Sequence, residues 1–145
     1  MPNYTRMFGS KQDYQEALDR LDVPSASARV GHEHWMSSSD CGPLVPNASS
    51  RPLIILGEQP MTYLPNRVGP GEEEADLWPI VIAFVQSNHW VAVELQEVDG
   101  VLPFPPVWNG WNKAKNTLPE ALRWEAVLQV SFDMWQMLGS PELDV

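Results

Sequence analysis

Cysteine is almost absent from this sequence, which has one such residue, Cys41. A single cysteine cannot form a disulfide bond within the chain. The first residues also lack the order of basic, apolar and then small residues that marks a secretory signal peptide. We therefore expect an intracellular protein, either cytoplasmic or nuclear.

Basic residues are scarce as well, with nine Lys and Arg against 19 Asp and Glu and a formal net charge of −10. Nucleic-acid binding depends on clustered cations, so this balance disfavours nucleic acid as a partner. Long apolar runs are missing too, because the longest, around residues 77–85, is far below the roughly 20 residues of a membrane-spanning helix. The sequence predicts neither a nucleic-acid nor a membrane partner.

Apolar and aromatic residues, by contrast, are plentiful. Hydrophobic residues make up 43% of the 145 positions, and seven of them are Trp. A chain of this length and composition can form the core of one domain. Two continuous apolar runs, residues 53–56 and 61–64, predict strands that are buried on both faces.

The segments around these strands predict two helices and a loop. Ser10 and Asp13 have the spacing of a helix start, and an apolar stripe follows over residues 11–22. A short irregular helix is expected over residues 35–45, where Gly42, Pro43 and Pro46 limit its length. Residues 65–77 are rich in Gly, Pro and Glu and are expected to form an exposed loop without packed structure.

The most informative segment carries a histidine between two strand-like runs. Residues 80–85 are continuously apolar, residues 90–95 alternate, and a polar turn that ends at His89 separates them. This pattern predicts an antiparallel hairpin with His89 at the start of the return strand. The fold class is α/β (α+β), with a small mixed or antiparallel central sheet and flanking helices.

The C-terminal part predicts an extended segment followed by a helix. Pro103, Pro105 and Pro106 each lack a backbone donor and exclude regular strand pairing there. Thr117 and Glu120 then resemble a capping box, and an apolar stripe continues from Trp124 to a stop at Gly139. Packing on the core is the favoured explanation of the stripe, and a partner-binding face is the alternative.

The hairpin resembles the catalytic-histidine strand of OTU-like (ovarian tumour) cysteine proteases, in which an aromatic residue follows the His, as Trp90 does here. The similarity extends to the segments that begin at His34, Leu53, Met61 and Pro79 and end near Trp111. These segments resemble a divergent branch of the family found in proteins derived from mobile elements. The order of these elements is the same as in the C-terminal part of that domain.

The resemblance implies a fold, a substrate class and a role for one residue. Residues 1–116 would be the C-terminal portion of an OTU-like domain, and residues 117–145 an amphipathic helix that packs on it. The family is directed at ubiquitin or ubiquitin-like proteins, and His89 takes the position of its general base. No cofactor is implied.

A cysteine protease needs a nucleophile, a general base and a polar group that orients the base. This sequence offers a residue for the base but none at the family's positions for the other two. The family's nucleophile lies in an Asp-Gly-Asn-Cys motif, which the sequence lacks, and Cys41 lies in a segment where the family has no nucleophile. We expect Cys41 to be a small buried or semi-buried thiol instead. The family often has Asp or Asn two residues after the His, and Val91 occupies that position here. Asn88 would point to the other side of the strand.

A metal site is a weaker alternative. His32, His34 and Cys41 are metal-ligand types within ten residues, but a structural zinc site needs four ligands and no close pair follows. No Gly-rich phosphate loop and no serine nucleophile motif are present in the sequence. We expect no metal ion.

Two functions therefore remain. The first is the C-terminal part of a ubiquitin-directed cysteine protease domain, inactive as this chain because its cysteine lies elsewhere. The second is a non-catalytic interaction module derived from the same fold. Under either function, the apolar surface that the missing helix of the family would cover must be protected. We expect the C-terminal helix to fold over that surface, or the chain to self-associate.

Overall fold

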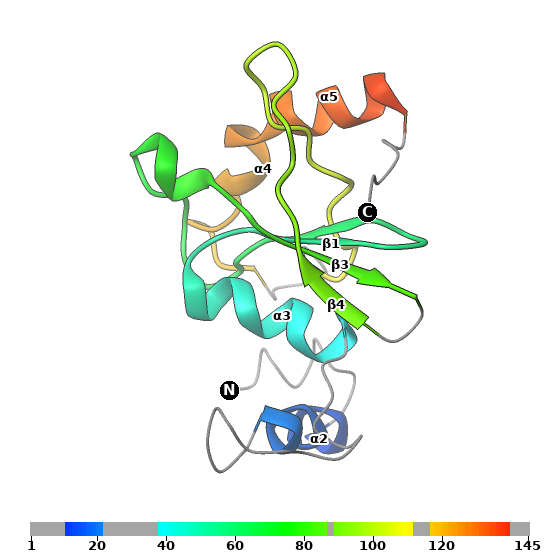
Figure 1. Ribbon diagram of the computed structural model, residues 1–145. Helices are drawn as coiled ribbons and strands as arrows, with labels where there is room; N and C mark the ends of the chain where they lie inside the picture. The colour runs from blue at the N-terminus through cyan, green and yellow to red at the C-terminus, as the bar shows by residue number, and fades with distance from the viewer. Residues whose placement is uncertain (1–10, 22–37, 87–88, 112–116, 140–145) are drawn as a thin grey trace.

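The computed structural model describes residues 11–21, 38–86, 89–111 and 117–139 (Figure 1). A four-stranded sheet of order β2-β1-β3-β4 forms its centre. β1 and β3 are parallel, and the two outer pairs are antiparallel. The mixed sheet with helices confirms the α+β class. The strands are β1 Leu53–Leu56, β2 Met61–Tyr63, β3 Ile80–Val85 and β4 His89–Ala92.

β1 lies in the middle of the core, as its continuous apolar sequence predicts, and all four of its residues are buried. Ile54 and Leu56 belong to one cluster with Trp124 and Trp135 of the C-terminal helices, and we call this side of the sheet the α5 face. Leu53 and Ile55 form the other cluster with Tyr63, on the α3 face. Figure 1 shows α3 on one side of the sheet and α4 and α5 on the other.

Helix α2, Lys11–Leu21, confirms the helix expected from residue 11. Helix α3, Ser38–Ser49, corrects the prediction that a short helix ends near residue 45. It runs through Pro43 and Pro46, both of which are buried. Each interior proline costs a helix about 3 kcal/mol. Packing of α3 on β1 and β2 offsets this cost, with Val45 against the cluster of the α3 face.

The loop after β2 differs from the exposed loop predicted over residues 65–77, because most of its first half is packed. Asn66 is 1% exposed, and its backbone N–H and side-chain oxygen bind the Asn47 carboxamide of α3 at 3.0 and 2.7 Å. The carbonyls of Pro65 and Val68 accept the indole N–H groups of Trp111 and Trp124. Buried backbone groups need such partners, and sequence composition does not show them. The second half, with the 3₁₀ helix η2 Glu74–Leu77, is mostly exposed.

The chain after the hairpin leaves the sheet earlier than predicted, at Ala92 instead of residue 95. Asp99 and Gly100, both with positive φ, form the expected turn between Val98 and Val101, which exchange two hydrogen bonds. Residues 103–111, which we call the strap, then run beside the free edge of β2. Val107 pairs there with Thr62 in an isolated parallel bridge.

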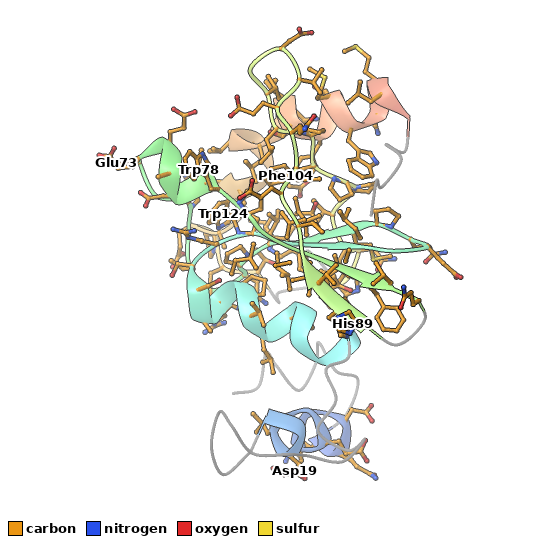
Figure 2. All side chains as sticks on the ribbon, in the orientation of Figure 1. Asp19, Glu73, Trp78, His89, Phe104 and Trp124 are labelled. Carbon is orange, nitrogen blue, oxygen red and sulfur yellow. The ribbon has the colours of Figure 1, made fainter. Side chains whose placement is uncertain are left out.

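The C-terminal helix is two helices, α4 Arg123–Val127 and α5 Gln129–Leu138, which join at Leu128. The prediction of a helix start at Thr117 is wrong. Residues 119–122 form turns instead, and the Leu118 N–H donates to the Asn66 carbonyl at 2.9 Å. The stripe packs on the core as expected: Trp124 lies between α4 and the sheet (Figure 2), and Leu128, Met134 and Trp135 are also buried.

Candidate functional site

His89 is the first residue of β4, where it pairs with Val85 of β3 (Figure 2). The hairpin is held by the next pair, Phe84 and Trp90, whose ring centroids lie 4.9 Å apart. Such cross-strand aromatic pairs stabilise a hairpin beyond the area that they bury. The sequence prediction for His89 is confirmed in its position: it stands at the strand end, and its side chain is exposed.

The alternation of side chains along β4 gives the direction of the imidazole. Trp90 packs against the cluster of the α3 face, whereas Val91 and Val85 pack against the cluster of the α5 face. Residues two apart in a strand share a face, so His89 belongs with Val91 on the α5 face. The ring therefore stands at the rim of that face, beside the free end of the hairpin.

Cys41 lies in α3, on the other side of the sheet. Its side chain is outside the described part of the structure, but its helix packs on the α3 face through Val45. The sheet thus separates the backbone of Cys41 from the His89 ring. The structure does not bring these two candidate residues together.

The orienting group of a catalytic histidine is also missing from the described residues. Val91, two positions after His89, is half-buried and has no polar atom in its side chain. Asn88 lies outside the described residues. Within the ranges that the structure describes, the His89 ring makes no hydrogen bond or ion pair. It is an accessible base with no structural partner there.

The described residues form neither a metal site nor a membrane-spanning helix. The described positions contain no group of three His, Cys, Asp or Glu side chains that could hold a metal ion. His32 and His34 lie outside those positions. No helix in the described ranges is long and apolar enough to cross a bilayer.

A second candidate site was not foreseen from the sequence. An open hollow of about 350 Å³ lies between the strap and helices α4 and α5. Trp108 is on its strap side, and Glu125, Gln129 and Phe132 are on its helix side. Gln129 and Phe132 are three residues apart in α5, and this spacing was a usable signal for a shared face. The strap residues on the other side of the hollow are brought there by the tertiary fold, which the sequence does not show.

Comparison with known proteins gives no match for this chain among family models, curated proteins or solved structures.

Proposed function

We propose that this chain is the C-terminal part of an OTU-like cysteine protease domain, directed at ubiquitin or a ubiquitin-like protein. His89 is its general base, and the cysteine comes from sequence outside this chain. The observation that carries the proposal is the accessible imidazole at the start of β4. The β3–β4 hairpin that bears it lies beside β1 in the central sheet.

In the proposed reaction the cysteine sulfur is the nucleophile and the His89 imidazole transfers the protons. The His89 imidazole accepts the proton of a cysteine thiol, and the thiolate attacks the carbonyl carbon of the scissile amide. The imidazolium then returns the proton to the leaving amine as the C–N bond breaks, which leaves a thioester. A water molecule activated by the same imidazole hydrolyses the thioester and releases the cysteine. The sulfur must therefore reach the rim of the α5 face.

A non-catalytic interaction module is the second candidate. It is favoured by the separation of Cys41 from His89 by the sheet, since this chain then carries no nucleophile for its base. Phe84, exposed by 41%, also extends an aromatic surface at the hairpin where a partner could bind. Both candidates predict that the chain alone does not cleave ubiquitin chains.

The deciding experiment adds a nucleophile. A ubiquitin whose C-terminus carries an electrophile should leave this chain unlabelled but should label a fusion that supplies an Asp-Gly-Asn-Cys segment. His89→Gln in the fusion should slow labelling by about 10²-fold or more, because it removes the general base. His34→Gln is the matched control and should leave the rate unchanged.

Two results would reject the protease proposal. If the fusion is labelled at an equal rate with and without His89→Gln, His89 is not the general base, and the interaction module is the remaining candidate function. Labelling of the unfused chain that disappears in Cys41→Ser would make Cys41 the nucleophile and contradict the assignment of the cysteine to another segment.

A further inference from the structure

The hollow beside the strap lies at the opposite edge of the sheet from His89, since the strap borders β2 and His89 lies in β4. It is open to solvent, because Asn109, Glu125 and Gln129 are all exposed. Its volume, about 350 Å³, is at the small end of ligand sites and suits one or two side chains. It is lined by Val107, Trp108, Asn109, Glu125, Gln129 and Phe132.

The strap side of the hollow is held rigidly. The backbone N–H of Trp108 donates to the Thr62 carbonyl at 2.8 Å. The indole ring stacks on Tyr63, with centroids 5.5 Å apart and an interplanar angle of 28°. Gly110 leaves room for the ring, because a Cβ atom there would lie 2.3 Å from Trp108. The aromatic side of the hollow is therefore formed before any ligand arrives.

The helix side presents polar groups above an aromatic base. The Phe132 ring packs edge-on against Phe104 at 5.9 Å, and the Phe104 N–H ties the strap to the Ser131 carbonyl of α5. The Gln129 amide donates to Asp133 at 2.9 Å, which leaves its oxygen as an acceptor. The hollow thus combines acceptor oxygens with aromatic faces.

Charge selects the ligand. Glu125 forms no ion pair with any basic side chain in the described ranges, and the whole chain has a formal net charge of −10. Glu125 and Trp108 both line the hollow and favour a cation there, because a carboxylate and an indole each attract positive charge. An anionic ligand would meet repulsion from Glu125 and from Asp133.

We propose that this hollow binds an arginine side chain of a partner polypeptide. A guanidinium is planar and stacks on an indole, and its fork of N–H donors matches a carboxylate. The Trp108 ring provides the stacking surface and Glu125 the carboxylate. Asn109 and Gln129 offer oxygens for the remaining N–H groups. This site does not depend on the proposed function of His89.

The test uses the full chain and a short peptide, acetyl-Gly-Arg-Gly-amide, followed by NMR of the Trp108 indole N–H and the backbone amides. We expect saturable shifts at Trp108, Glu125 and Gln129. The same peptide with citrulline in place of arginine keeps the shape but has no charge. It should bind about two- to fivefold more weakly, as should the arginine peptide to Glu125→Gln.

Matched variants separate this site from general attraction to an acidic protein. Glu97→Gln removes the same charge at an exposed position outside the hollow and should leave affinity unchanged, as should His89→Gln. Equal binding of the arginine and citrulline peptides would overturn the proposal. Shifts that map to another surface, or undiminished affinity in Glu125→Gln, would overturn it as well.

Discussion

At the scale of single residues, the contact between α3 and the sheet depends on Gly42. A Cβ atom at this position would lie 2.3 Å from the ring of Tyr63, which is itself buried and stacked on Trp108. The same burial raises the pKa of the Tyr63 phenol, because desolvation disfavours its charged form. Helix α3 therefore approaches the sheet closely only because Gly42 has no side chain.

The prediction for Gly42→Ala is a competition between two terms. In a free helix, alanine would stabilise the chain by about 0.5–1 kcal/mol, whereas overpacking against a buried ring costs about 1–3 kcal/mol. We expect the free energy of unfolding in urea to fall by about 1 kcal/mol or more. Gly57→Ala is the control, since no atom lies within 4 Å of its added Cβ. A Gly42→Ala variant as stable as the wild type would contradict this packing.

At the scale of elements, the strap replaces a fifth strand at the β2 edge. Its prolines lack N–H donors, but their carbonyls accept: Thr62 donates its N–H to Pro106 at 2.8 Å and its hydroxyl to Pro105 at 2.7 Å. Trp108 returns one bond to Thr62. This arrangement closes the edge and also places Trp108 at the hollow.

The substitution Thr62→Val tests this attachment. Valine keeps the shape and suits a strand, but it leaves the buried Pro105 carbonyl without its hydroxyl donor. We expect a loss of about 1–3 kcal/mol in the free energy of unfolding, with faster hydrogen exchange of the Trp108 amide. Unchanged stability and exchange would show that the hydroxyl bond does not hold the strap.

The elements that were predictable from sequence are those whose signal is local. β1, β3 and β4 follow from apolar runs and a polar turn, and the start of α2 follows from its capping pattern. Errors arose where a tertiary contact decides the structure, as at Asn66, whose backbone N–H and side chain bind Asn47 and pack the loop after β2. The position of His89 was predictable, but the hollow was not, because its two sides are distant in sequence.

At the scale of the whole molecule, one strand joins two cores. β1 contributes Ile54 and Leu56 to the α5 face and Leu53 and Ile55 to the α3 face. The C-terminal helices cover the first face with Trp124 and Trp135, so the apolar stripe packs on the core. Exposed apolar side chains remain on the outer side of these helices, at Val130 and Met137. Fold-back over the place of a missing helix and self-association both stay predictions.

Because both cores share β1, we predict that they unfold together. Leu53→Ala and Leu56→Ala delete the same atoms from opposite faces, at positions 2% and 1% exposed. Each should lower the free energy of unfolding by about 2–5 kcal/mol, and tryptophan fluorescence and circular dichroism should still give one coincident transition. The free energy of unfolding of the double variant should fall by the sum of the two single losses, within about 0.5 kcal/mol. If the unfolding transitions followed by fluorescence and by circular dichroism differ in any variant, one face folds without the other. The sheet would then not couple the hairpin that bears His89 to the helix that bears Cys41.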